Sequence, residues 1–255
     1  MINIKTRYEI EQMKTAGRIV FEVLELLKEK VEPGITTKEL DRIATNYIIK
    51  CGAFPSFKGV KGSHRAKPFP AAICTSINDE VIHGIPGNRV LKEGDIISID
   101  VGARYNGYHG DAARTYPVGK CSEEALRLIE VTKDSFFEGI KKAYAGYRII
   151  DISGNIQDYV EKNGFSVVRE FTGHGIGKEL HEGPEIPNYR SRIPGPRLVS
   201  GMSLAIEPMV NAGMSNIRMA SDHWTVLTAD GKFSAHYENT VIITDNEPIL
   251  TTLYK

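Results

Sequence analysis

The segment IDVGARYNGYHGDAART, which runs from Ile99 to Thr115, constrains the fold more than any other part of the chain. Its Asn-Gly pair at residues 106–107 is the preferred sequence of a two-residue type I′ hairpin loop. With that loop, Gly102 faces Asp111 across the hairpin. Because side chains alternate along a strand, Asp100 and Asp111 then lie on the same face as diagonal neighbours, roughly 7–8 Å apart.

Two carboxylates that converge in an apolar sheet repel each other. At a separation of ~4 Å and an effective dielectric constant of about 20, the repulsion costs on the order of 4 kcal/mol, and desolvation adds to it. A shared proton, a nearby Arg or Lys, or a metal ion would relieve it. Arg114 is close in sequence, but strand alternation points it to the face opposite Asp111. The hairpin alone leaves the three arrangements open.

Two further acids and one histidine favour the metal. Glu207 in LAIEPM and Glu238 in HYENTV are each embedded in an apolar run that predicts a strand, and His174 lies between glycines in TGHGIG. The glycines suggest a backbone that must pass close to another group. Each residue alone is weak evidence, since most isolated acids lie at strand edges and most histidines among glycines are turn residues. Together, four carboxylates and one imidazole match two divalent cations, with Mn, Fe(II) or Co favoured and Zn also compatible.

Two more histidines lie in similar contexts. His83 in VIHGIP and His181 in ELHEGP are each followed within three residues by Gly and Pro, ahead of an acid-bearing segment. Either could be an ordinary surface histidine, but their matching positions favour a role as donors that hold a carbonyl or amide beside the metals. His109 and His236 flank ligand candidates, and we expect them to pack against or support the ligands.

The arrangement of predicted elements indicates an internal repeat over residues 7–119 and 122–248. Glycine and apolar positions of residues 34–52 recur in residues 146–164, and GDIISIDVG (94–102) aligns with GMSLAIEPM (201–209), which puts an acid opposite an acid. Chance similarity between two αβ segments is the alternative. We expect an α+β fold of mostly antiparallel strands backed by helices, in one domain over residues 1–255 with pseudo-twofold symmetry.

Apolar periodicity predicts where the helices lie. It indicates helices over residues 7–30, from a Thr36 cap to residue 51, and over 122–144 and 151–162. Residues 51–67, rich in Gly, Pro and Lys, read as a long loop.

The net charge, the apolar runs and the cysteine count exclude several classes of protein. The formal net charge of zero predicts no nucleic-acid partner and no anionic membrane partner. No apolar run approaches the ~20 residues of a membrane span, and the N-terminus lacks the apolar core of a signal peptide. Three cysteines without a CxxC pair predict reduced thiols. We therefore expect a cytoplasmic protein, and a monomer.

In this order and spacing, the motifs VIHGIP, SIDVGARYNGYHGDAART, TGHGIG, LHEGPEIP, IEPMVNAG, DHWTV and SAHYENT resemble those of the type I methionine aminopeptidases of bacteria. The resemblance covers nearly the whole chain. It implies a pita-bread fold with a dinuclear metal site between two pseudo-symmetric halves. It also implies that Asp111 and Glu238 bridge both ions, with Asp100 on one ion and His174 and Glu207 on the other.

The activity implied by the resemblance is removal of the initiator methionine from nascent polypeptides, with a small second residue preferred. A metal-bound water or hydroxide would hydrolyse the bond, and the two ions would be Co, Mn, Fe(II) or Zn. Glu207 would shuttle the proton, His181 would stabilise the oxyanion, and His83 would contact the amide nitrogen of the leaving peptide. The methionine side chain would lie against Phe69, Cys74, Leu180 and Trp224.

One segment departs from the family pattern. VKGSHRAK, at residues 60–67, is basic and longer than expected for this loop. It makes the assignment of Phe69 less secure than that of the ligands. A solvated charged loop is the simpler interpretation, and a transient contact with the ribosome or the nascent chain is the alternative.

Three rival functions remain. Proline dipeptidases and aminopeptidase P share the metal ligands but usually carry a large N-terminal domain, which this sequence lacks. A catalytically dead pita-bread protein could act as a binding module, but such a module has no reason to keep four mutually repelling acids. A metal-storage protein would need neither the two loop histidines nor an apolar pocket.

Overall fold

The structure is a computed structural model that describes residues 2–62 and 66–254, so part of the basic segment at 60–67 lies outside the described residues. The described helices are α1 (Arg7–Lys28), α2 (Thr37–Lys50), α3 (Glu123–Ile140) and α4 (Ile149–Lys162). The strands of the first half of the chain are β1 (Phe54–Pro55), β2 (Ile73–Ile77), β3 (Glu80–Ile82), β4 (Ile96–Tyr105) and β5 (Tyr108–Pro117). Those of the second half are β6 (Ser166–Val167), β7 (Gly173–Gly175), β8 (Glu182–Ile186), β9 (Ser203–Ile206), β10 (Met209–Asn211), β11 (Ile217–Met219), β12 (Val226–Thr228), β13 (Ser234–His236), β14 (Asn239–Ile242) and β15 (Ile249–Leu250).

The hairpin that joins β4 to β5 has the predicted register. Tyr105 pairs with Tyr108 and Gly102 with Asp111. Asn106 has a φ of 47° and Gly107 a φ of 83°, and positive φ at both loop positions is the type I′ geometry. The prediction that the two hairpin aspartates share a face is therefore confirmed.

The helices form where sequence periodicity and capping agree, but α1, α2 and α3 end before the predicted residues 30, 51 and 144. Thr6 and Glu9 form a reciprocal capping box at the start of α1, whereas the Thr36 side chain accepts the Glu39 N–H at the start of α2. Helix α3 stops at Ile140 instead of 144, because the following residues bond three positions back and the chain turns. Residues 51–67 are not all loop, since β1 pairs with β4.

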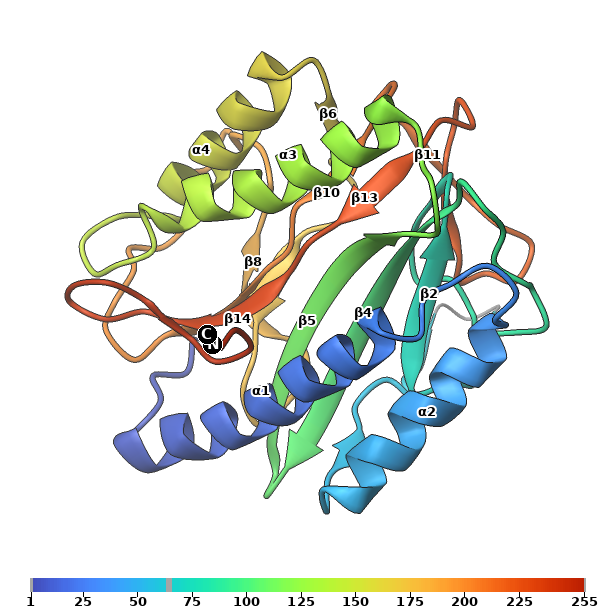
Figure 1. The fold of residues 1–255 in the computed structure, drawn as a ribbon. Helices are drawn as coiled ribbons and strands as arrows, with labels where there is room; N and C mark the ends of the chain where they lie inside the picture. Colours follow the sequence, from blue (N-terminus) through green and yellow to red (C-terminus); the bar gives the residue numbers. More distant parts are fainter. Residues whose placement is uncertain (1, 63–65, 255) are drawn as a thin grey trace.

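Each pair of helices covers its own group of strands (Figure 1). Helices α1 and α2 pack on β2, β4 and β5 and bury one apolar core with them. Helices α3 and α4 pack on β6, β10 and β13 over a second core. All strand pairs between named strands are antiparallel, so the predicted α+β class is confirmed. The repeat and the single-domain boundary stay predictions.

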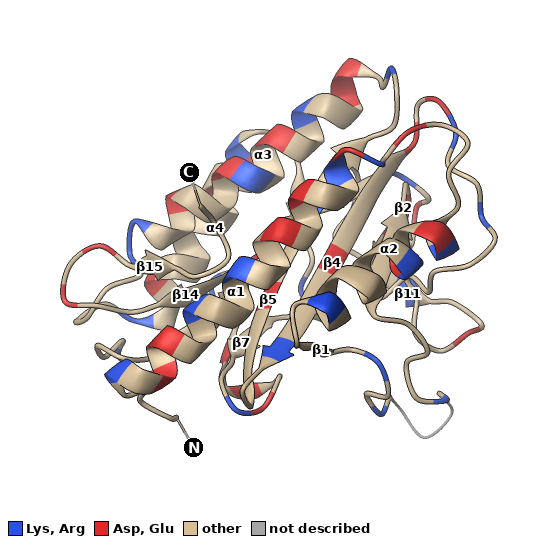
Figure 2. Ribbon diagram, turned by 60° about the horizontal axis from the view of Figure 1, so that its bottom comes forward, with Lys and Arg blue, Asp and Glu red and all other residues tan. Residues whose placement is uncertain are grey.

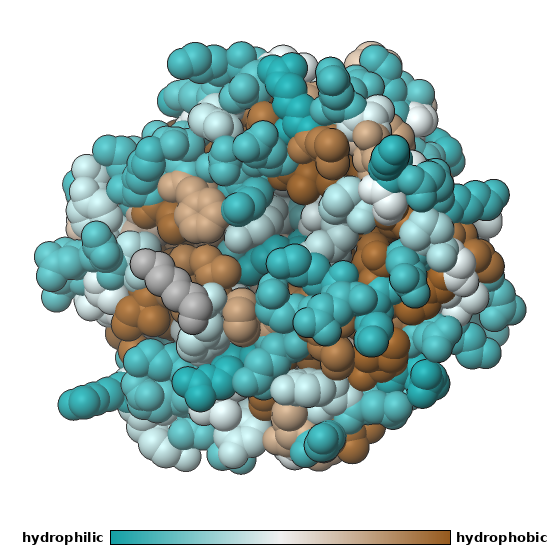
Figure 3. Space-filling model, in the orientation of Figure 1, coloured by the Kyte–Doolittle hydropathy of each residue, from teal (hydrophilic) through white to brown (hydrophobic). Residues whose placement is uncertain are grey.

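The surface is mixed in charge. Lys and Arg alternate with Asp and Glu along the outer faces of α1 and α3 (Figure 2), and hydrophilic residues cover most of the face seen in Figure 3, with apolar patches between them. None of the described helices has the length and apolar character needed to cross a bilayer.

Helix α1 lies unusually close to β5 and to the C-terminal segment at one point. A Cβ on Gly17 would lie 2.1 Å from the Thr251 carbonyl oxygen, and a Cβ on Gly110 would lie 2.7 Å from the Gly17 nitrogen. Two glycines therefore permit the helix to seat on the strand that carries Asp111.

We expect Gly17→Ala to lower the free energy of unfolding by about 1–3 kcal/mol, because the added methyl meets backbone that cannot yield. Gly154→Ala is the matched control in α4, since its Cβ would meet only the end of the Arg190 side chain, at 3.1 Å. Helix propensity should make that change neutral or stabilising by up to about 1 kcal/mol. Urea denaturation followed by circular dichroism measures both, and equal effects would contradict the close approach.

Candidate metal centre

A cavity of about 550 Å³ opens between the two groups of strands. Every residue that the sequence analysis singled out as a ligand, donor or pocket residue lines it: Phe69, Cys74, His83, Asp100, Asp111, His174, Leu180, His181, Glu207, Trp224 and Glu238. Sequence reasoning did not find several apolar lining residues, among them Phe57, Ile82 and Phe171. The cavity therefore combines clustered acids with an apolar wall.

The four acids reach the cavity in two different ways. Asp100 and Asp111 lie in the middle of continuous strands, as predicted. Glu207 and Glu238 do not lie within strands: Glu207 falls between β9 and β10, and Glu238 between β13 and β14. At both points the chain leaves one sheet and enters another, because β9 and β14 belong to the five-stranded sheet and β10 and β13 to a three-stranded one. The expectation of two acids inside apolar strands was wrong in this respect.

His174 lies in β7 between two glycines that are required by close backbone packing. A Cβ on Gly173 would lie 2.3 Å from the Ala205 carbonyl oxygen, and one on Gly175 would lie 2.1 Å from the Gly183 carbonyl oxygen. This confirms that the backbone around His174 passes close to neighbouring strands. The His174 Nδ1 atom lies 2.8 Å from the Gly175 carbonyl oxygen, which leaves Nε2 free to face the acids.

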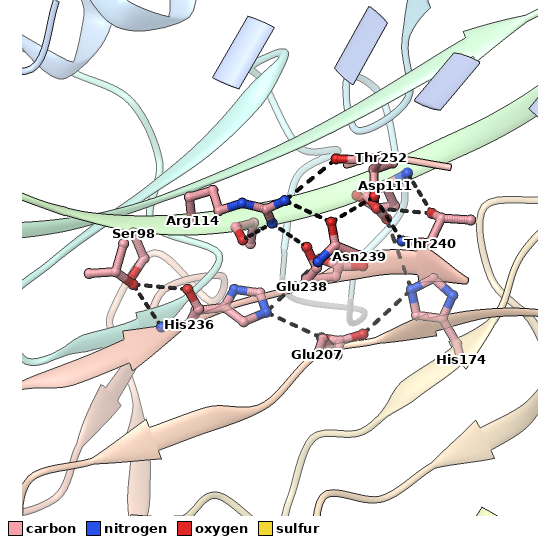
Figure 4. A network of polar contacts seen from close by, with 12 residues as sticks. Ser98, Asp111, Arg114, His174, Glu207, His236, Glu238, Asn239, Thr240 and Thr252 are labelled. Carbon is pink, nitrogen blue, oxygen red and sulfur yellow. Dashed lines mark hydrogen bonds and ion pairs between the residues drawn. The ribbon is translucent and has the colours of Figure 1, made fainter. Parts of the chain in front are cut away.

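The two groups of strands meet along β5 and the β13–β14 segment through threonine hydroxyls (Figure 4). The Thr240 hydroxyl accepts the Asp111 N–H at 3.0 Å and donates to the Asp111 carbonyl at 2.9 Å. The Thr115 hydroxyl makes the same pair of bonds with His236, both at 2.9 Å. Between these two bridges, the Glu238 N–H donates directly to the Ala113 carbonyl at 3.0 Å.

At two points of this seam a hydroxyl stands between the two backbones, where an ordinary ladder would have direct N–H to carbonyl bonds. The seam also fixes the backbones of Asp111 and Glu238, one in each group of strands. We name these contacts, made by residues 111–115 and 236–240, the threonine seam. Nothing in the sequence marks Thr115 or Thr240 for this role.

The ligand candidates converge tightly. One potential ligand atom from each of Asp111, His174 and Glu238 lies within 4.8 Å of the others. The His174 Nε2 atom is 3.6 Å from Glu207 Oε1 and 4.0 Å from Asp111 Oδ2. One oxygen of each of Asp100, Asp111 and Glu238 is buried without a hydrogen-bond partner among the described residues. Buried carboxylate oxygens of this kind need a proton or a cation.

Burial dominates the titration of these groups. It raises the pKa of Asp100 to about 7. Burial, followed by the charges of Asp100 and Glu207, raises the pKa of Asp111 well above its ordinary value, and burial followed by neighbouring carboxylates does the same for Glu207 and Glu238. Burial also lowers the pKa of His174 to about 4, which leaves a neutral imidazole able to act as a ligand.

Arg114 does not relieve the repulsion by pairing with the acids. Its guanidinium donates to the Ala113 carbonyl oxygen. It also donates to the Glu238 carbonyl oxygen and to the Asn239 side chain, as Figure 4 shows. It also stacks over the Tyr237 ring at 4.2 Å. Of the three arrangements left open by the sequence, these contacts argue against a basic side chain. A metal ion is therefore favoured over Arg114 as the group that offsets the repulsion.

The two loop histidines lie on the cavity wall. His83 adopts a φ of 60° and packs edge-on against Phe171 and Trp224, and burial lowers its pKa to about 4. The His181 ring lies 4.5 Å from that of His174. Both are therefore placed to present an N–H to a bound molecule.

The remaining two candidates support other groups. His236 Nε2 lies 3.8 Å from Glu207 and 4.0 Å from Glu238, while His109 Nδ1 contacts the Ser56 hydroxyl at 2.9 Å. Sequence reasoning also missed Asn188, whose side-chain amide donates to the Glu207 carbonyl oxygen at 2.9 Å.

Comparisons with known proteins agree with this geometry. The model of metallopeptidase family M24 matches residues 11–245. The chain is 58% identical to a methionine aminopeptidase of Clostridium perfringens over 255 residues, which is 100% of both chains. It is 43% identical to that of Escherichia coli, covering 100% of this chain and 95% of the relative.

Solved structures give the same result. The methionine aminopeptidase of Thermotoga maritima superposes with a TM-score of 0.95 at 43% identity, with 100% of both chains covered. A prolidase from Pyrococcus furiosus is similar in fold alone, with a TM-score of 0.79 at 23% identity, and the chain covers 66% of its length.

Raised carboxyl pKa values predict how the metal-free protein responds to pH. A carboxyl with a higher pKa in the folded state stabilises the fold below its unfolded pKa and loses that contribution as the pH rises through the folded pKa. The buried histidines act in the opposite direction below about pH 7.5, because their pKa is near 6.5 in the unfolded state and lower in the folded state. Above that pH they are neutral in both states, so we expect the metal-free protein to lose about 1 kcal/mol or more of stability between about pH 7.5 and 8.5.

Chemical denaturation in the presence of a chelator, at both pH values, measures this loss. Added Mn(II) should stabilise the protein more at about pH 8.5 than at about pH 7.5, because the cation replaces bound protons. A metal-free protein of equal stability at the two pH values would contradict the assignment.

The threonine seam predicts a contrast between two substitutions. Thr240→Val removes the bridging hydroxyl and leaves the buried Asp111 N–H and carbonyl unpaired, which should cost about 1–3 kcal/mol of stability and weaken Mn(II) binding. Thr240→Ser keeps the hydroxyl and should retain most of both. Isothermal titration calorimetry and urea denaturation measure the two quantities, and a serine variant as impaired as the valine variant would count against the seam.

Proposed function

The chain belongs to metallopeptidase family M24, and from this premise we propose that it removes the N-terminal methionine from polypeptides by metal-dependent hydrolysis. The predicted pita-bread α+β fold is confirmed by the structural likenesses. One observation carries the proposal: four carboxylates and a neutral imidazole converge in a cavity whose other wall is apolar. A peptide amine and carbonyl could lie at the acids while an apolar side chain occupies the wall.

Members of a metallopeptidase family use divalent metal, and the carboxylate oxygens that lack partners are the feature of this chain that fits one. We propose two ions, because four carboxylates balance two divalent charges. Asp111 and Glu238 would contact both, Asp100 would hold one, and His174 with Glu207 the other. When bound, such ions lower the pKa of a water molecule and polarise a carbonyl. Metal analysis of protein purified from its natural cell would identify the ion among Co, Mn, Fe(II) and Zn.

Three side chains would act on the substrate. Glu207, whose two oxygens face His174 and His236, would take the proton from the attacking water and pass it to the leaving amine. His181 would donate to the oxyanion, and His83 would contact the amide nitrogen of the leaving peptide. Lowered pKa values keep both imidazoles neutral at pH 7, so each carries one N–H and adds no positive charge beside the cations.

The apolar wall would take the methionine side chain. Phe69 and Trp224 pack edge to face at 5.1 Å, and the Trp224 indole N–H donates to the Lys67 carbonyl oxygen at 2.8 Å. Burial raises the pKa of the Cys74 thiol, so it stays uncharged, and Leu180 is buried beside it. An apolar, uncharged wall of this kind favours binding of an unbranched thioether side chain over a charged one.

The partners follow from the reaction. The substrates would be nascent polypeptides that begin with Met and carry a small second residue, and the protein would act as a monomer in the cytoplasm, where its three free cysteines stay reduced. Lys58, Lys61 and Lys67, in and beside the basic segment, are exposed, and Lys61 also lines the cavity. They would support a transient ribosome contact, although a solvated loop is the simpler role.

A peptide assay tests the activity. We expect the metal-free protein reconstituted with Mn, Co, Fe(II) or Zn to release methionine from Met-Ala and Met-Gly peptides and to cleave Xaa-Pro peptides poorly. Preference for the proline substrates would favour the dipeptidase alternative. Metal-independent peptide binding without turnover would favour a binding module.

The shared ligand gives a sharper test. Asp111→Asn should reduce turnover by about a thousandfold or more and lower the number of bound ions, because it removes a charge that both ions need. Glu11→Gln, on the exposed face of α1, is the control and should change neither quantity. Metal content by atomic emission, measured beside turnover, decides the matter; full occupancy in the Asp111 variant would exclude a bridging role.

A further inference from the structure

The N-terminal segment is joined to the loop that carries His181 by a buried ion pair. The Lys5 ammonium lies 2.6 Å from a Glu182 carboxylate oxygen, and the two side chains are only 4% and 6% exposed. Glu182 directly follows His181. A buried ion pair at this position contrasts with the exposed pairs along the outer face of α1.

Further hydrogen bonds complete this pair. Glu182 Oε2 also accepts from the Asn3 side-chain amide at 3.2 Å, and Oε1 accepts the Glu179 backbone N–H at 3.2 Å. The Lys5 ammonium donates as well to the Asn3 carbonyl at 3.2 Å. Charged hydrogen bonds of this kind are stronger than neutral ones, and they fix the turn over residues 179–182.

The backbone is arranged to admit Lys5. A Cβ on Gly177 would lie 2.4 Å from Lys5 Cε and 2.7 Å from Glu182 Oε1, so the glycine leaves the space that the pair fills. The Gly177 carbonyl accepts the His109 N–H at 2.8 Å, which attaches the other side of the loop to β5. Ile2 forms a parallel bridge with Gly183. The segment over residues 177–183, which ends in the first residues of β8, is thus held between β5 and the N-terminal segment.

His181 has little else to orient it. Its ring lies against the His174 ring at 4.5 Å and lines the cavity, but the residue is exposed. Among the described residues no hydrogen bond to the His181 ring is found. The direction of the imidazole therefore depends on the backbone on either side of it, and on one side that backbone is Glu182.

We propose that Lys5 is a positioning residue, which acts through Glu182 to hold His181 at the cavity wall. This inference rests on the proposed function, in which His181 donates to the oxyanion of the cleaved bond. Lys5 touches no substrate itself. The N-terminal segment is thereby part of what assembles the site.

A double-mutant cycle on the full chain loaded with Mn(II) tests the proposal. Lys5→Met keeps the length of the side chain but not its charge, and should lower kcat on a Met-Ala peptide about tenfold while KM changes less than about twofold. In a His181→Ala background, the same change should lower kcat by no more than about twofold, because the group that it positions is gone. Lys14→Met, which breaks only the exposed pair with Glu11, is the matched control and should leave kcat unchanged.

Two outcomes would overturn the proposal: an undiminished kcat in Lys5→Met, or an equal loss of kcat in both backgrounds. Thermal unfolding shows whether each variant is folded at the assay temperature. If Lys5→Met does not fold, Glu182→Gln carries the same cycle, since it keeps acceptor oxygen for Lys5 but removes the charge.

A spectroscopic measurement separates this inference from the proposed function. In zinc-loaded protein labelled with ¹⁵N-histidine, the ring resonances of His181 should shift or broaden in Lys5→Met and not in Lys14→Met. If His181→Ala alone retains full kcat, the role of His181 in the reaction fails, while a shift of its resonances still supports the positioning. Unchanged resonances in Lys5→Met would overturn the positioning whatever the activity.

Discussion

Repulsion among four carboxylates is the constraint on which the rest of the structure depends. Asp100, Asp111, Glu207 and Glu238 converge where the two groups of strands meet. Burial raises the pKa of each above its ordinary value, and the charges of neighbouring carboxylates raise that of Asp111, Glu207 and Glu238 further. A fold that brings such groups together loses stability unless protons or cations occupy the space between them. The close glycine packing of α1 on β5 and the backbone bonds around each acid keep the carboxylates from moving apart.

The threonine seam explains how two groups of strands approach without closing. A continuous backbone ladder across β5 and β14 would bring the strands to the usual spacing of about 4.8 Å. Hydroxyls from Thr115 and Thr240 take the place of direct backbone bonds at two points, and the direct bond at Ala113 fixes the centre. The seam therefore supplies rigidity and space together, a combination that suits a site which must hold ions and admit a substrate.

The sequence predicted the parts of the site that local rules control. The Asn-Gly turn determines which residues of β4 and β5 face each other. The common face of Asp100 and Asp111 therefore followed from their spacing alone. Glu207 and Glu238 were identified as unusual acids but were placed inside strands, because an apolar run does not reveal where a chain changes sheets.

The contributions of Thr240 and Lys5 had no local signal at all. Thr240 matters only because β14 lies beside β5, and a lysine just before a helix cap is ordinarily solvated. Pairings between segments more than a hundred residues apart cannot be derived from periodicity, and these pairings decide how the ligands and the donors are held.

The threonine seam also determines when the site can exist during synthesis. The Asp111 N–H donates to the Thr240 hydroxyl, and Thr240 in turn donates its own N–H to the Thr252 hydroxyl. A growing chain that has already folded α1, α2 and the first hairpin still lacks every partner on the far side of the cavity. During translation, Asp100 and Asp111 therefore lack the rest of the metal centre until residue 252 has been added and can reach β14.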